Sequence, residues 1–208
     1  MTTALFTHPD SLRHTTPPGH PERIARIESL AHALKGKDLL RLEAPLATQA
    51  DLALCHPELY IKTIEAEEPD EGFAQLDGDT YMSPGSYNAA CAGVGGAMKA
   101  VDMVLAGEVQ NAFVATRPPG HHAEAAFPMG FCLFGTVAIA AMHALERHGL
   151  SRVAVVDFDV HHGNGTQAIL RAEPRALFIS SHQMPLWPGS GKAEETGDHD
   201  NVLNVPLS

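Results

Sequence analysis

The sequence is poor in cysteine, in basic residues and in long apolar runs, and each shortage excludes a class of protein. Its three cysteines are odd in number and lack CxxC spacing, so we expect reduced thiols in a cytoplasmic compartment rather than a disulfide framework. Lysine and arginine total 14 against 25 acidic residues, a net charge of −11 that argues against nucleic-acid binding. No apolar run approaches the roughly 18 residues of a transmembrane helix, and no signal peptide is visible, so no membrane partner is expected.

Several catalytic signatures are missing as well. The chain contains no GxxxxGK[ST] loop and no GxGxxG after a predicted strand, which argues against the common phosphate and dinucleotide sites. It contains no GxSxG elbow, so serine-hydrolase chemistry has no support. The unusual number in the composition is 13 histidines, several of which are adjacent.

Helical and strand patterns alternate along the 208 residues, which predicts a single α/β domain over 1–208 with a parallel sheet. The valine-rich segment 152–158 is typical of a strand buried on both faces of such a sheet. Gly93, Gly95 and Gly96 in one predicted helix indicate close packing against a neighbour, and the acidic segment 65–79 is predicted to be a loop. Helices are expected over 21–34, 83–106, 131–147 and 163–171, and strands over 111–116, 152–158, 176–180 and 202–205.

Polar residues gather at the end of the valine-rich segment. Asp157, Asp159 and His161 are spaced by two, so on an extended strand end their side chains share a face. Carboxylate and imidazole suit Zn²⁺ or another first-row divalent ion. The alternative is that they are loop and helix-cap groups, but two carboxylates buried together without a cation would cost several kcal/mol.

A second histidine motif, RPPGHHA, follows the predicted strand 111–116 directly. Its prolines and glycine make a stiff turn that is suited to holding His121 and His122 in one geometry. Asp157 is a plausible hydrogen-bond partner for one of these histidines and Asn164 for the other. The alternative is that the two histidines are ordinary surface loop residues.

Taken in order, HPERIARI, RPPGHHA, MGFCLF and VDFDVHHGNGTQ resemble the histone deacetylase / acetylpolyamine amidohydrolase superfamily, in its class II and bacterial branch. The motifs extend from His20 to about His182. The resemblance implies a three-layer α/β fold in which helices flank a parallel sheet. It also implies a zinc-dependent amidohydrolase that hydrolyses N-acetyl amides, with acetyl-lysine peptides and acetylpolyamines both open as substrates.

The resemblance implies a role for each matching residue. Asp159 and His161 match two zinc ligands. His122 matches the proton shuttle, which Asn164 orients, and His121 matches its electrostatic partner, which pairs with Asp157. The other implied roles are backbone ligands of a structural potassium ion (Asp157, Asp159, His161, Ser180 and Ser181), walls of the substrate tunnel (Gly130, Phe131 and Trp187) and the arginine of an internal channel (Arg23).

Two features of the family are not found in these residues. They are a third zinc-binding aspartate in an AGFDAH-like segment and a tyrosine in a Gly-Gly-Tyr motif. We therefore expect the chain to be the N-terminal two-thirds of a family domain that lacks its C-terminal strands, and to bind zinc poorly and turn over slowly. Exposed apolar surface and self-association are then expected. The alternatives are a non-catalytic relative that binds an acylated ligand or partner, and, less favoured by the Asp spacing, a dimanganese ureohydrolase.

Overall fold

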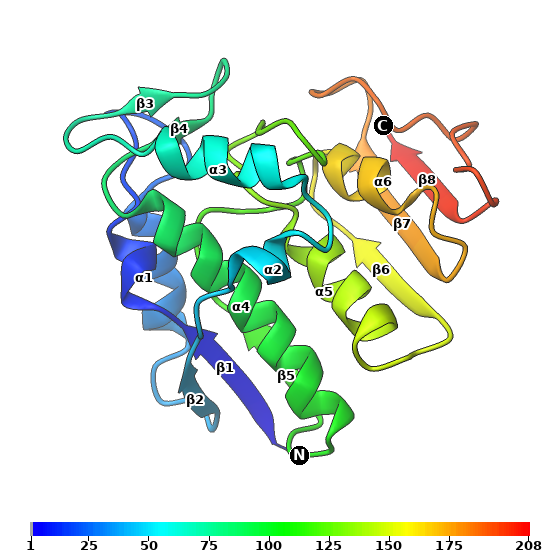
Figure 1. Cartoon of the computed structure of the whole chain (residues 1–208), viewed down its shortest axis with the longest axis horizontal. Helices are drawn as coiled ribbons and strands as arrows, with labels where there is room; N and C mark the ends of the chain where they lie inside the picture. Colours follow the sequence, from blue (N-terminus) through cyan, green and yellow to red (C-terminus); the bar gives the residue numbers. More distant parts are fainter. Residues whose placement is uncertain (1) are drawn as a thin grey trace.

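The computed structural model describes residues 2–208, in which helices pack against strands that are mainly parallel (Figure 1). The strands are β1 (Thr3–Thr7), β2 (Leu40–Glu43), β3 (Ala74–Gln75), β4 (Tyr81–Met82), β5 (Asn111–Val114), β6 (Val153–Asp157), β7 (Ala176–Gln183) and β8 (Val202–Leu207). The helices are the 3₁₀ helix η1 (Pro9–Leu12) and α1 (Ile24–Ala33), α2 (Gln49–Leu52), α3 (Glu58–Ala66), α4 (Ser86–Leu105), α5 (Thr136–Glu146) and α6 (Asn164–Leu170).

Six of the strands form two parallel sheets of three, ordered β2-β1-β5 and β6-β7-β8. The strands β3 and β4 form a separate antiparallel hairpin. The register places Asp157 at the end of β6 opposite Ser180 in β7. The predicted α/β class with parallel strands is therefore confirmed. The sequence did not predict η1, α2, α3 or the strands β1 to β4, and β3 lies within the segment 65–79 that was predicted to be a loop.

Helices α4 and α5 lie side by side across the two sheets and join them (Figure 1). Helix α4 packs on β1 and β5, while α5 packs on β6 and α6 packs on β7. The largest cluster of buried apolar side chains includes Ile61, Val94 and Phe134, which come from α3, α4 and the loop before α5. None of the helices in the described part of the chain is both long enough and apolar enough to cross a lipid bilayer.

The glycines of α4 permit the close packing that the sequence indicated. A Cβ atom on Gly95 would lie 2.0 Å from the backbone oxygen of Pro45, and one on Gly96 would lie 2.9 Å from Cβ of Ala44. Since neither contact leaves room for a methyl group, α4 requires glycine at both positions to approach the segment that follows β2.

The helix that was predicted to start at Phe131 starts at Thr136, so this boundary was wrong. Gly130 and Phe131 have φ angles of 56° and 71°, and this left-handed backbone cannot belong to an α-helix. Similarly, α4 begins at Ser86 rather than at Ser83 because Gly85 before it has a φ of 92°.

The prediction that the valine-rich strand is buried on both faces was also wrong. Val156 is 60% exposed and Phe158, just beyond β6, is 85% exposed. Within residues 2–208, β6 pairs only with β7, and β5 pairs only with β1, so each of these strands forms an open edge of its sheet. A cavity of about 540 Å³ lies beside β6 and is lined by apolar side chains that include Val137 and Val155.

Candidate active site

The loop between β5 and α5 carries the histidine pair, and a buried ion pair anchors its start. The Arg117 guanidinium donates to both carboxylate oxygens of Glu22 at 2.5 Å, and also to the backbone oxygens of Ser11 and His14. Glu22 is fully buried, and Nε2 of His14 lies 3.3 Å from its carboxylate. Although burial raises the pKa of Glu22, the bonds to His14 and Arg117 outweigh it and lower that pKa to about 2. The loop therefore leaves β5 in a fixed direction.

The start of α6 holds the same loop from the other side. The backbone N–H of Thr166 donates to the oxygen of His121 at 3.1 Å. A Cβ atom on Gly165 would lie 2.3 Å from the oxygen of Ala123, so only glycine lets α6 approach this closely. This contact brings the GHH loop to the polar segment that follows β6.

His121 pairs with the carboxylate at the end of β6. Its Nδ1 lies 2.9 Å from Oδ2 of Asp157, whose other oxygen accepts the backbone N–H of Asp159. Burial raises the pKa of Asp157, but the hydrogen bond and charge of His121 lower it by more. Asp157 is thus held as a carboxylate that fixes the orientation of the His121 ring.

His122 is 4% exposed, and its ring centroid lies 3.8 Å from that of His121. Its Nδ1 donates to Oδ1 of Asn164 at 2.8 Å, while the amide of Asn164 donates to Glu124 at 3.2 Å. Burial lowers the pKa of His122 to about 4, with a further contribution from the charge of His121. His122 is therefore neutral near pH 7, and its free lone pair is on Nε2. This is the state that a general base requires.

Asp159 and His161 form a pair of metal donors beside these histidines. Oδ1 of Asp159 lies 3.1 Å from Nδ1 of His161, and both side chains are partly exposed, at 48% and 38%. The ring of His161 lies 5.9 Å from that of His122. A carboxylate and an imidazole fit a zinc ion as two of its ligands. Among residues 2–208, no third His, Cys, Asp or Glu completes a group of three with them.

The indole ring of Trp187 packs against the histidine pair. The Trp187 ring packs edge-on against His122 at 4.6 Å, and it lies 6.0 Å from His161. A Cβ atom on Gly130 would lie 2.4 Å from the His122 ring and 2.6 Å from the Trp187 ring. Glycine at this position is therefore what allows the indole to reach His122.

Phe131 is fixed by residues from distant parts of the chain. Its backbone N–H donates to Oγ1 of Thr80 at 3.0 Å, and its ring packs edge-on against His20 at 4.8 Å. His20 also contacts the backbone oxygen of Asp79 at 3.0 Å. Burial and the charge of Asp77 raise the pKa of the Asp79 carboxyl. The sequence did not single out Thr80, because a lone threonine in a loop gives no signal of its contacts.

The histidine pair, the Asp159–His161 pair, Gly130 and Phe131 line a cavity of about 330 Å³. It adjoins the larger apolar cavity beside β6, and four residues line both: Pro119, His121, Asp159 and Val160. Its lining residues are Pro21, Arg26, Pro119, His121, His122, Gly130, Phe131, Asp159, Val160 and His161.

Six predicted site residues do not line this cavity. Three of them, Asp157, Asn164 and Trp187, contact its histidines, and the other three lie elsewhere. Arg23 is exposed at the start of α1, and the arginine that lines the cavity is Arg26. Ser180 lies on β7 opposite Asp157 at the end of β6, Ser181 follows it, and neither lines this cavity. The roles assigned to all three stay predictions.

Known proteins resemble this chain in sequence and in fold. The Histone deacetylase domain family matches residues 20–208. An uncharacterised protein of Synechocystis sp., slr0245, is 44% identical over 211 residues, covering 98% of this chain and 69% of that protein. A histone deacetylase-like amidohydrolase of Pseudomonas aeruginosa is 44% identical over 192 residues, covering 90% of this chain and 50% of that protein. The crystal structure of the HDA15 HD domain superposes with a TM-score of 0.93 and 32% identity, covering 100% of this chain and 62% of that one. The chain thus spans between half and about two thirds of these relatives.

Proposed function

The chain belongs to the histone deacetylase family, and from this premise we propose that it is the part of a zinc-dependent deacetylase that carries the proton-transfer residues. The observation that carries the proposal is the position of His122. This neutral, buried imidazole is oriented by Asn164 and lies in the same cavity as the Asp159–His161 donor pair.

His122 acts as the general base. Because Nδ1 is committed to Asn164, Nε2 accepts a proton from the attacking water and later returns it to the leaving amine nitrogen. The C–N bond of the amide breaks, and a carboxylic acid and an amine are released. His121, held by Asp157, stabilises charge that develops beside His122.

Asp159 and His161 would hold the zinc ion. When bound there, zinc polarises an amide carbonyl and lowers the pKa of water. Gly130, Phe131 and Trp187 enclose the acyl chain next to His122, and we assign Asp79 to the rim, since its backbone meets the His20 that packs on Phe131. Acetyl-lysine and acetylpolyamine both present the neutral amide that such a tunnel accepts.

The remaining assignments complete the proposal. A structural potassium ion is held by backbone oxygens where β6 ends beside β7, Arg23 serves an internal channel, and residues 1–208 act as one domain. A reducing, cytoplasmic compartment is supported by the three free thiols, of which Cys91 and Cys132 are buried.

A second function, binding of an acylated ligand without turnover, has one observation in its favour. Among residues 2–208, no third His, Cys, Asp or Glu completes a group of three with the donors Asp159 and His161 of this cavity. Since a catalytic zinc normally has three protein ligands, these residues by themselves should bind zinc weakly.

One experiment tests both functions. The 208-residue chain is incubated with zinc, its metal content is measured, and acetate release is followed from an acetyl-lysine peptide and from an acetylated polyamine. We expect the Asp159–His161 pair to bind little zinc and turnover to be slow, and His122→Gln should reduce that turnover by a further 10²–10⁴-fold or so. The matched control is His32→Gln on exposed α1, which should change nothing.

Acetate release that is indifferent to His122→Gln would overturn the assigned base. Saturable binding of the acetylated peptide with no acetate release at any zinc concentration would favour the non-catalytic function instead.

A further inference from the structure

A second group of potential metal ligands lies away from the candidate active site. Asp102 is in the last turn of α4, His143 is in the last turn of α5, and His148 follows that helix. Both helices end where the chain turns back into β5 and β6, at the amino ends of those strands. The candidate active site follows the carboxyl ends of the same strands, so the two groups of residues lie at opposite ends of β5 and β6.

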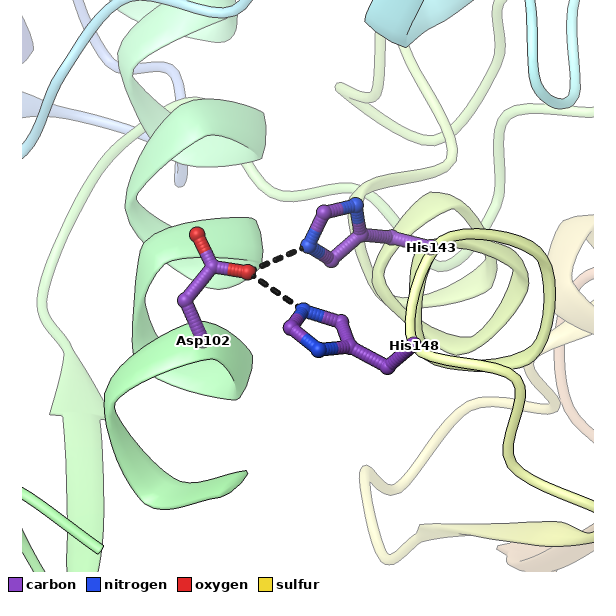
Figure 2. A group of neighbouring side chains, drawn as sticks. All are labelled: Asp102, His143 and His148. Carbon is purple, nitrogen blue, oxygen red and sulfur yellow. Dashed lines mark hydrogen bonds and ion pairs between the residues drawn. The ribbon is translucent and has the colours of Figure 1, made fainter. Parts of the chain in front are cut away.

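The three side chains converge on one atom. Oδ1 of Asp102 lies 2.6 Å from Nε2 of His143 and 2.7 Å from Nε2 of His148, and Figure 2 shows both imidazoles directed at the same carboxylate oxygen. The two rings lie 5.0 Å apart, edge to face. The three ligand atoms all lie within 4.8 Å of one another, and no other group of three His, Cys, Asp or Glu in the described residues meets that condition.

We propose that Asp102, His143 and His148 bind a divalent transition-metal ion such as Zn²⁺ between α4 and α5. Two imidazoles and a carboxylate are a typical three-ligand set for this ion, with water as the fourth ligand. Ligand bonds of about 2.0–2.2 Å require the carboxylate to withdraw slightly from the two rings. Asp102 and His148 are free to make this movement, since their side chains are 37% and 31% exposed.

The burial of the three groups suits a site that solvent can reach. His143 has a side chain that is 7% exposed and provides a fixed ligand, while the two exposed partners admit an ion and its water. Nδ1 of His143 is buried without a hydrogen-bond partner among the described residues. No donor to Nδ1 therefore fixes the ring proton on Nε2, and Nε2 can offer its lone pair to a metal ion. Metal ligands usually have such a partner, so we expect the affinity to be lower than in sites that have one.

The competing interpretation is a hydrogen-bonded clamp without metal, in which Asp102 accepts from both imidazoles and ties α4 to α5. The two interpretations differ in what a metal ion does to the chain. A clamp is indifferent to added zinc, whereas a metal site raises the melting temperature as zinc is added, because the ion binds the folded state only.

The test separates this site from the Asp159–His161 pair. An Asp159→Ala, His161→Ala double variant of the 208-residue chain is titrated with Co²⁺ and Zn²⁺, and bound metal is measured by absorption and by elemental analysis after dialysis. We expect about one ion per chain, held at the α4–α5 site. Adding Asp102→Asn or His148→Gln should weaken binding on the order of 100-fold or more, since loss of a direct ligand should cost at least as much as loss of an outer partner.

The matched control is His199→Gln, which removes an exposed histidine outside the group. If the double variant is not folded by circular dichroism, the same titration is done on the otherwise unmodified chain, where His148→Gln should remove one bound ion. Metal binding that survives both Asp102→Asn and His148→Gln, or no binding in the folded double variant, would overturn the proposal in favour of the clamp.

Discussion

Glu22 and Arg117 form a buried ion pair that stabilises the fold only while both partners are present. Both charges are taken out of water, and the carboxylate satisfies the guanidinium through two hydrogen bonds of 2.5 Å. Removing one partner from such a pair leaves the other buried and uncompensated, which is more costly than never having buried the pair.

Replacing Glu22 with Gln should therefore destabilise the fold by about 3–5 kcal/mol, as measured by urea unfolding. Glu28→Gln on the exposed surface of α1 is the control, and it should change stability by less than about 0.5 kcal/mol. Equal stability of the two variants would contradict the structural role of the pair.

The same carboxylate predicts how the fold responds to acid. The pKa of Glu22 falls from 4.5 to about 2 in the folded chain, so the unfolded chain binds its proton first as the pH is lowered. The ion pair then contributes its full stability above pH 4.5, and roughly 3 kcal/mol is lost as the pH falls through about 2. Urea unfolding between pH 7 and pH 2 measures this loss, and Glu22→Gln should remove most of this dependence.

His122 should titrate far below an ordinary histidine. Burial and the charge of His121 lower its pKa to about 4, so the neutral form persists until the pH falls through that value. A nuclear magnetic resonance titration of the metal-free chain, with the signal assigned by its loss in His122→Gln, should show a midpoint near 4. A midpoint near 6.5 would mean that the ring is not desolvated.

At the scale of elements, the glycines of α4 lower its helix propensity but allow it to pack closely against the segment that follows β2. Gly95→Ala gains about 1 kcal/mol of helix propensity but places a methyl group 2.0 Å from the Pro45 oxygen. Backbone must move to relieve this contact, so we expect a net destabilisation of about 1–3 kcal/mol.

Gly93→Ala is the control in the same helix. Its nearest neighbour is Oγ1 of Thr116 at 3.3 Å, a side-chain atom that can yield, so its stability should change by less than about 1 kcal/mol. Thermal or urea unfolding of the two variants compares them directly. A stabilised Gly95→Ala variant would show that α4 does not need the close approach.

The elements differ in how well their local sequence describes them. Strands β6, β7 and β8 and helix α6 lie close to their predicted ranges because their apolar patterns are continuous and bounded by glycine or polar residues. The start of α5 was misplaced because the apolar residues around Phe131 continue the helical pattern through a left-handed turn. Strands β1 and β2 were missed although they are no shorter than β6 and β5, because neither has a continuous valine-rich run like that of β6.

At the scale of the whole molecule, the open edges of β5 and β6 are where association with another chain is expected. Val156 and Phe158 are exposed beside an apolar cavity, where a parallel strand normally has a neighbour. Unpaired edges with apolar side chains are sites of association. We therefore expect the 208-residue chain to self-associate as its concentration rises.

Sedimentation velocity over a range of concentrations measures this association. A Val156→Lys, Phe158→Lys double variant should shift the chain toward monomer, because charged side chains on an edge oppose strand pairing. Leu59→Lys, which replaces a 78% exposed leucine on α3, is the control and should leave association unchanged. A monodisperse wild-type monomer would contradict the expectation.

The sequence by itself determined the chemistry that is available, because ligand type and two-residue spacing are local properties. The sequence alone identifies Asp159 and His161 as candidate metal donors. It also identifies the tandem His121 and His122 as candidate bases. Only the tertiary structure decided which of them meet and in what state, since the contact of His122 with Asn164 spans 42 positions and its burial depends on residues from several elements. The convergence of α4 and α5 that brings Asp102 to His143 and His148 likewise has no trace in local sequence, because contacts between helices depend on how the helices pack.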